Sequence, residues 1–153
     1  MSVTHATFVL ERTYPASPAR VFRAFSDPAA KVLWFKGPDD WNSKSEMDFR
    51  VGGTEWSEGD IPNGPTTRFD ATYYDIVQDE RIVYCYEMHL DANKISVSVT
   101  TVELTPVGSG TKLVLTEQGA YLDGYDDAGA REHGTNDLLD ALGASLAQDP
   151  VSS

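Results

Sequence analysis

Hydrophobic and polar side chains alternate along most of the chain, as expected for strands with one buried face. Residues rich in Val, Thr, Phe and Tyr predict a first strand over residues 4–14. Later strands are predicted over residues 43–51, 54–57, 67–77, 81–90, 94–105 and 111–118. Most of the later strands are separated by only a few turn-forming residues, so consecutive strands are expected to pair antiparallel.

Helical patterns occur at two places. Ser17-Pro18 and Asp27-Pro28 each supply a capping oxygen and a proline suited to a first helical turn, which predicts two short helices after the first strand. The apolar residues expected on them are Val21, Phe22 and Phe25 on the first and Val32, Leu33 and Trp34 on the second. A long C-terminal helix is predicted over residues 128–148, because leucines recur every four residues from Leu138.

This order of elements predicts an α+β fold. A single antiparallel sheet with the long helix on one face buries the apolar surfaces of both. The chain shows no internal repeat and no linker, so one domain over residues 1–153 is expected, with residues 119–127 forming a Gly- and Asp-rich loop before the helix.

Alternation along the strands predicts which side chains face the helix. The expected inner set is Phe69, Ala71 and Tyr73; Ile82, Tyr84, Tyr86 and Met88; Ile95, Val97 and Val99; and Leu113, Leu115 and Glu117. An aromatic surface with a few polar groups is typical of a small-molecule pocket, but aromatic residues in strands also fill ordinary cores. The strand pattern leaves both interpretations open.

Glycines in the C-terminal helix bear on the same question. Each glycine inside a helix costs about 1 kcal/mol relative to alanine. Gly134 lies one turn before Leu138 and shares its face, which indicates either a close backbone approach or space for a molecule beside the helix. Alternatively, Gly129 belongs to the loop and Gly143 to a tightly packed face.

Composition narrows the function classes. Of 153 residues, 24 are acidic and 12 are basic, giving a net charge of −12 that disfavours nucleic acids and anionic membrane surfaces. The acid excess indicates a solvated surface or a saline habitat more than an acid-seeking partner. A single cysteine, no apolar run long enough to cross a bilayer and no signal-peptide pattern predict a cytoplasmic protein.

Motifs that would carry chemistry are scarce. The three histidines are dispersed, and the acidic loop with Asp123, Asp126 and Asp127 lacks the spacing of a calcium-binding loop. The sequence contains neither a phosphate-binding loop nor a Gly-x-Ser-x-Gly elbow, and Cys85 lies in mid-strand. We therefore expect no metal site and no cofactor.

Glu117 is the one carboxylate predicted to point inward. It could act as an acid or a base with a raised pKa, or it could simply be paired with a basic or hydroxyl side chain. Arg68, Tyr73, Tyr84 and Tyr86 are candidate partners.

Several local strings together resemble a known family. They are Ser17-Pro-Ala-Arg-Val-Phe-Arg-Ala-Phe-Ser-Asp-Pro28, Gly52-Gly53 followed by Trp56, Arg81-Ile-Val-Tyr-Cys-Tyr86, Gly110-Thr-Lys-Leu-Val-Leu-Thr-Glu-Gln-Gly119, and the helix from His133-Gly134 to Leu142. In this order, the chain resembles the SRPBCC or START-like superfamily over about residues 8–146. Within it, the chain is most similar to the branch named after the activator of the ninety-kilodalton heat-shock-protein ATPase, whose bacterial members are often labelled polyketide-cyclase-like.

The resemblance implies a helix-grip fold, a curved antiparallel sheet around a long C-terminal helix with a cavity between them. Two positions depart from the family pattern. Glu117 stands where many relatives have histidine, and Thr135 follows Gly134 where many have tryptophan. Both positions fall near the implied cavity, so the ligand is left open.

The leading hypothesis is that the cavity binds a small hydrophobic or aromatic molecule. The residues expected to contact this ligand are Trp34, Trp41, Phe69, Tyr73, Tyr84, Tyr86, Gly134 and Leu138, with Glu117 or Tyr121 fixing its orientation and residues 119–127 gating the opening. One alternative is a cyclase- or dehydratase-like enzyme, for which Glu117 is the single catalytic candidate. Another is a co-chaperone-like protein that stimulates a chaperone ATPase, and the family resemblance is also compatible with a homodimer.

Overall fold

Strands and helices follow one another in the predicted order in the computed structural model, which describes residues 2–148. They are β1 (Val3–Tyr14), α1 (Pro18–Ser26), α2 (Pro28–Lys31), β2 (Asn42–Met47), β3 (Thr54–Asp60), β4 (Thr66–Val77), β5 (Arg81–Leu90), β6 (Asn93–Val107), β7 (Gly110–Leu122) and α3 (Ala128–Gln148). The fold class is α+β, as predicted.

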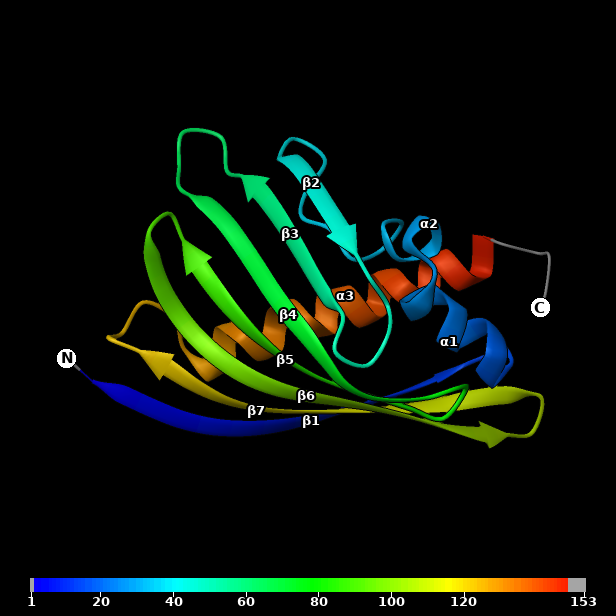
Figure 1. Cartoon of the computed structure of the whole chain (residues 1–153). Coiled ribbons are helices and arrows are strands. Elements are labelled where there is room, and N and C mark those ends of the chain that lie inside the picture. Colours follow the sequence, from blue (N-terminus) through cyan, green and yellow to red (C-terminus); the bar gives the residue numbers. More distant parts are fainter. Residues whose placement is uncertain (1, 149–153) are drawn as a thin grey trace.

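The strands form one antiparallel sheet in the order β1-β7-β6-β5-β4-β3-β2 (Figure 1). The short turns from β4 to β5 and from β5 to β6 place Asp79 and Asp91 at positive φ, where short polar residues are tolerated. The β1 strand closes the order by pairing with β7, from Val3 opposite Leu122 to Tyr14 opposite Thr111. This pairing continues β7 to Leu122, so the first residues of the predicted loop are strand.

Capping fixes the two short helices where the sequence predicts them. The Ser17 side chain accepts a hydrogen bond from the Arg20 amide at 3.2 Å, and Asp27 accepts one from the Ala29 amide at 3.1 Å. The second helix, α2, has only four residues and ends at Lys31.

The residues after α2 correct one prediction. Val32, Leu33 and Trp34 lie beyond the helix, and the first two are exposed. Trp34 is buried. Its indole nitrogen donates a hydrogen bond to the Ala24 carbonyl at 2.9 Å, which joins this segment to α1.

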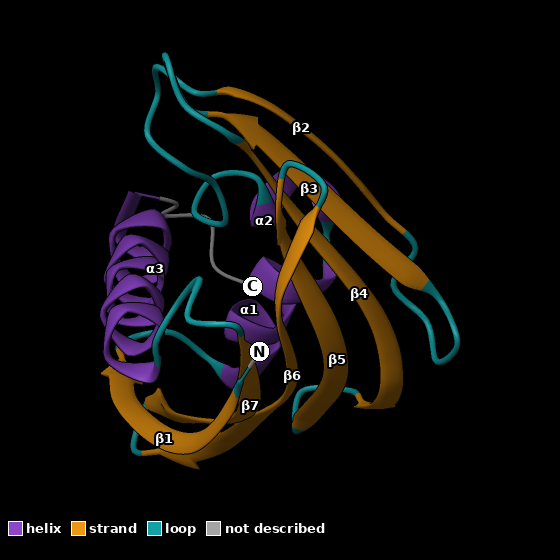
Figure 2. Cartoon of the chain, turned by 90° about the vertical axis from the view of Figure 1, so that its left-hand side faces the viewer, coloured by secondary structure: helices purple, strands orange, loops and turns teal. Residues whose placement is uncertain are grey.

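The long helix α3 lies over the β1 end of the curved sheet, while β2, β3 and β4 rise on the opposite side (Figure 2). It packs against β1 and α1. Its fully buried residues, among those the structure describes, are Leu139, Leu142 and Leu146. The Tyr14 hydroxyl donates to the Leu139 carbonyl at 2.7 Å, and Gly143 lets the Tyr14 ring approach the helix, since a Cβ there would lie 3.1 Å from it.

Strand register arranges the inner face in rows that cross the sheet. Leu10, Leu115, Val102 and Ile82 lie opposite one another and form an apolar row. The next two rows are Phe8, Glu117, Thr100 and Tyr84, and then Ala6, Gly119, Ser98 and Tyr86. The inner face therefore changes from apolar to polar along the strands.

The β6 strand corrects the predicted inner set. Ser96, Ser98 and Thr100 are buried, whereas Val97 and Val99 are 42% and 36% exposed on the convex face. The physical reason is the register, which places the three hydroxyls beside the polar inner residues of β7. The prediction used apolar character alone, and it therefore turned the valines of β6 inward instead of the hydroxyl residues.

Candidate functional site

A buried carboxylate, Glu117, lies at the centre of the polar part of the inner face. Alternation in β7 places it beyond Leu113 and Leu115 on the same side, and it is 3% exposed. Its Oε2 accepts a hydrogen bond from the Tyr86 hydroxyl at 2.7 Å, and its Oε1 accepts one from Thr100 at 3.1 Å.

Burial is the main influence on this carboxyl, and it raises the pKa of Glu117 above its ordinary value. The hydroxyls of Tyr86 and Thr100 and the nearby Arg131 guanidinium act in the opposite direction without cancelling the effect of burial. Glu117 is therefore easier to protonate than an exposed glutamate.

Arg131, in the first turn of α3, joins this carboxylate to the helix. Its Nη1 donates to the Tyr86 hydroxyl at 2.9 Å and lies 3.8 Å from Glu117 Oε2. Its Nη2 donates to Ser96 Oγ and Asp126 Oδ2, both at 2.8 Å. One guanidinium thus connects α3, the preceding loop and the three strands β5, β6 and β7.

Two buried hydroxyls beside this cluster lack hydrogen-bond partners. They are Ser98 Oγ and Tyr121 OH, and both residues are no more than 2% exposed. The Ser98 hydroxyl contributes to lowering the pKa of Glu117, although its geometry does not make a hydrogen bond. A Cβ at Gly119 would lie 3.0 Å from Ser98 Oγ and 3.2 Å from Tyr121 OH, so the two hydroxyls converge on this glycine.

The predicted aromatic residues of β4 and β5 form one continuous group next to the carboxylate. Ring centroids are 4.8 Å apart for Phe69 and Tyr86, 6.1 Å for Tyr84 and Tyr86, and 6.0 Å for Tyr73 and Tyr84. All four residues are buried. The structure thus brings together Phe69, Tyr73, Tyr84, Tyr86, Glu117 and Tyr121 on the inner face.

The other four predicted ligand contacts make no direct ring contact with this group in the described part of the chain, and Trp34 reaches Phe69 only through the Phe35 ring. Trp34 packs edge-on against Phe25 at 4.9 Å, within the core around α1. Trp41 is half-buried near the edge of the sheet. Gly134 is exposed, and a Cβ there would meet no atom within 4 Å; Leu138 is half-buried against the hydrophobic core.

A second buried polar cluster escaped the sequence reasoning. Lys31 Nζ lies 2.7 Å from Glu55 Oε1, and the Tyr73 hydroxyl donates to the same carboxylate. Burial lowers the pKa of Lys31, an effect that the Glu55 carboxylate opposes. The signal that could have revealed Glu55 is its alternation with Trp56 in β3, which assigns the two side chains to opposite faces.

Arg131 was also missed, although helical spacing contains the signal. It precedes Thr135 by four residues, Leu138 by seven and Leu142 by eleven, which places it on the apolar face of α3. A basic residue on an apolar helix face indicates a buried partner across the sheet.

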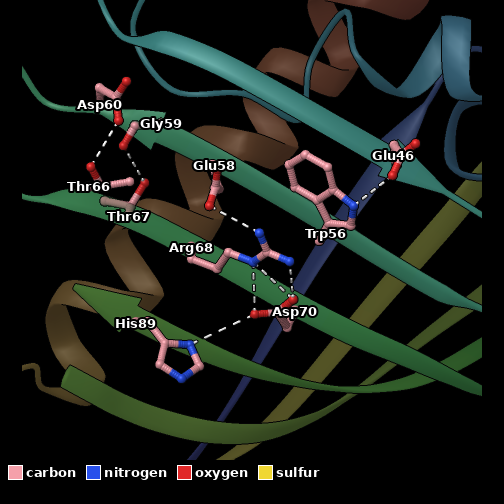
Figure 3. Close-up of polar contacts among 10 residues, drawn as sticks. All are labelled: Glu46, Trp56, Glu58, Gly59, Asp60, Thr66, Thr67, Arg68, Asp70 and His89. Atoms are coloured by element: carbon pink, nitrogen blue, oxygen red, sulfur yellow. Dashed lines mark hydrogen bonds and ion pairs between the residues drawn. The ribbon is translucent and has the colours of Figure 1, made fainter. Parts of the chain in front are cut away.

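Arg68, a candidate partner of Glu117, lies instead on the convex face of the sheet (Figure 3). Its Nη1 is 3.0 Å from Glu58 Oε2 and its Nη2 is 3.0 Å from Asp70 Oδ1, and its guanidinium lies over the Trp56 ring at 4.6 Å. Residue 68 alternates with the inner residue Phe69, so the two side chains point to opposite faces.

Two recesses among the described residues lie away from α3. One has a volume of about 50 Å³ and is bordered by Lys31 and Glu55, and the other, of about 100 Å³, is bordered by Trp41. The residues described as lining them come from α2, the segment after it and strands β2 to β4.

Within residues 2–148, no group of three or more His, Cys, Asp or Glu side chains could hold a metal ion. None of the helices in that same range is long and apolar enough to cross a membrane.

A family model described as "Activator of Hsp90 ATPase homolog 1-like protein" matches residues 15–147. The chain belongs to this family. Its helix-grip architecture, in which the curved sheet surrounds α3, is that of the SRPBCC superfamily, as the sequence resemblance implied.

Solved structures of relatives share both sequence and fold with this family member. A protein from Rhizobium loti is 51% identical, with 95% of this chain and 99% of that one covered and a TM-score of 0.89. A putative uncharacterized protein from Rhizobium leguminosarum is 46% identical over 97% and 98% of the two chains, with a TM-score of 0.93. Protein CV1439 from Chromobacterium violaceum is 31% identical over 94% and 98%, with a TM-score of 0.81. No curated protein matches the chain.

Proposed function

We propose that this protein binds a small hydrophobic or aromatic molecule between the inner face of the sheet and α3. The observation that carries the proposal is the continuous group of Phe69, Tyr73, Tyr84 and Tyr86, with the Glu117 cluster at one end. Aromatic walls with a few convergent polar groups are the usual composition of small-molecule sites.

Entry of a ligand requires α3 to move at its first turns. Among the described residues of α3, those before Leu139 include no fully buried side chain, whereas Leu139, Leu142 and Leu146 anchor the second half. The contacts of Arg131 hold the first half to the sheet. Displacing this one side chain would open the aromatic group toward solvent, and residues 123–127 would move with it.

The polar cluster also argues for binding rather than for stability alone. Burying a carboxylate and a guanidinium costs several kcal/mol of desolvation, which their mutual attraction often fails to recover. An apolar core would fill the same space at lower cost. Charged groups retained at the end of an aromatic surface are well placed to orient a ligand.

The proposal is tested with an uncharged fluorescent hydrophobic probe, N-phenyl-1-naphthylamine, titrated into wild-type protein and Tyr84→Ala. An aromatic contact contributes ~1 kcal/mol or more, so the substitution should weaken binding at least about fivefold. Tyr74→Ala is the matched control, because Tyr74 lies on the same sheet and is 60% exposed. Unchanged affinity in a folded Tyr84→Ala variant would contradict the proposed site.

A second candidate function is acid–base catalysis by Glu117 on the bound molecule. The observation that favours it is the raised pKa of a buried carboxyl hydrogen-bonded to the Tyr86 hydroxyl, since such a group holds its proton to a higher pH than an exposed glutamate does. Glu117→Gln should then abolish turnover of a substrate while retaining its binding. Equal turnover by this variant would leave binding as the sole function.

A further inference from the structure

The unpartnered hydroxyls of Ser98 and Tyr121 are the feature that the proposed function leaves unused. Buried hydroxyls are almost always hydrogen-bonded, and an unpaired one costs about 1–3 kcal/mol. Here two of them occur on adjacent strands, and both approach the same glycine, Gly119.

Small residues surround these hydroxyls on the sheet. Ala6, Gly119 and Ser98 lie opposite one another on β1, β7 and β6, and the row continues to Tyr86 of the aromatic group. Because Gly119 has no side chain, no Cβ occupies the space between the two hydroxyls. The row thus connects the aromatic group to two free hydrogen-bonding groups.

Charges next to the row are already engaged. Arg131 contacts Glu117, Asp126, Tyr86 and Ser96, so neither its guanidinium nor the carboxylates are left without a partner. Two carboxylates face one guanidinium there, which disfavours a further anion. A cation would have to compete with Arg131 for the same oxygens.

We propose that the bound molecule carries a neutral oxygen, a hydroxyl or a carbonyl, on an apolar ring system, and that Ser98 and Tyr121 hydrogen-bond this oxygen. The inference rests on the proposed function and narrows its ligand class. A hydroxyl can donate or accept, so the pair suits either kind of oxygen. The ring system lies against Tyr86 and its aromatic neighbours.

The test compares three probes of one shape, naphthalene, 2-naphthol and 2-naphthoate, by isothermal titration calorimetry. We expect 2-naphthol to bind about tenfold more tightly than naphthalene, because one or two net hydrogen bonds contribute about 0.5–1.5 kcal/mol each. We expect 2-naphthoate to bind more weakly than 2-naphthol.

Ser98→Ala and Tyr121→Phe should each weaken 2-naphthol binding about threefold to tenfold and leave naphthalene binding unchanged. Both substitutions remove an unpaired buried hydroxyl, so the variants should fold. Tyr74→Phe is the matched control on the convex face. Should Tyr121→Phe fail to fold, Ser98→Ala alone decides.

The outcomes separate the two proposals. If naphthalene and 2-naphthol bind equally, or if the variants lose affinity for both probes alike, the assigned hydrogen bonds are wrong while the ligand site stands. Tightest binding of 2-naphthoate likewise overturns the neutral-oxygen assignment. If none of the three probes binds to wild-type protein, the proposed function itself fails.

Discussion

The buried carboxyl of Glu117 makes the free energy of unfolding depend on pH. Because burial raises its pKa in the folded protein, the folded state keeps its proton to a higher pH than the unfolded state does. As pH rises from the ordinary glutamate value of 4.5, the unfolded chain releases this proton first. The free energy of unfolding therefore falls across that window, until the folded-state pKa is passed.

Glu117→Gln removes this pH dependence. We expect the melting temperature of the variant, relative to wild type, to rise as the pH increases above about 4.5, since only wild type carries the cost of a buried charge. Thermal unfolding followed by circular dichroism across this range measures the difference. Glu103→Gln on β6 is the control, because its side chain is exposed. A constant difference between the two proteins would show that folding does not raise the pKa of Glu117.

The sequence predicts the direction of the Glu117 side chain but not the residues that contact it. Alternation with Leu113 and Leu115 was enough to predict that Glu117 points inward. Its partners Tyr86 and Arg131 come from positions 31 residues before it and 14 after it, and only the assembled register brings them together. No local pattern contains that information.

At the scale of elements, α3 has two halves of different character. The second half is held by buried leucines and by Tyr14, the first turn by Arg131, and the middle by the hydrogen bond from Arg12 to Asn136. Apolar packing gives no support to the first turns, so they should open at a lower free energy than the rest of the helix.

Arg131→Ala tests this division of α3. We expect amide hydrogens of residues 128–135 to exchange about tenfold or more faster, since the loss of charged hydrogen bonds of about 1.5–3 kcal/mol each favours local opening. Exchange of residues 139–146 should change much less. Hydrogen–deuterium exchange with mass spectrometry resolves the two segments.

Arg12→Ala provides the matched control for Arg131→Ala. Arg12 also links a strand to α3, through Asn136 Oδ1 at 2.7 Å and Asp140 at 3.2 Å, but both of these partners follow residues 128–135. Its loss should leave the exchange of the first turns unchanged. Equal acceleration by both substitutions would show that Arg131 has no special role in holding the helix.

Elements with strong local signals were predicted well, and β6 shows where such signals fail. The caps at Ser17 and Asp27 are local signals, and α1 and α2 begin directly after them. The leucine repeat is also local, and it lies within α3. In β6, valines and hydroxyl residues alternate regularly, so the period was right and the face was wrong. The polar row of β7 beside it decides which face is buried, and that depends on pairing rather than on β6 itself.

For the whole molecule, the acid excess lies almost entirely outside the core. Among the described acidic residues, the fully buried ones are Glu55 and Glu117, and each has a basic residue nearby. The remaining acids are distributed over a surface with a net charge of −12. Their mutual repulsion opposes folding and is screened by salt.

Raising sodium chloride from 20 mM to 500 mM should therefore raise the melting temperature. Screening shortens the Debye length from about 20 Å to about 4 Å, so repulsion between exposed acids weakens. A gain of ~1 kcal/mol corresponds to about 2–4 °C for a domain of this size.

The double variant Asp40→Asn, Glu103→Gln, in which two exposed acids become neutral, should start from a higher melting temperature and gain less from salt. The opposite response, a fall in melting temperature with salt, would mean that surface ion pairs such as Lys112–Glu11 outweigh the repulsion.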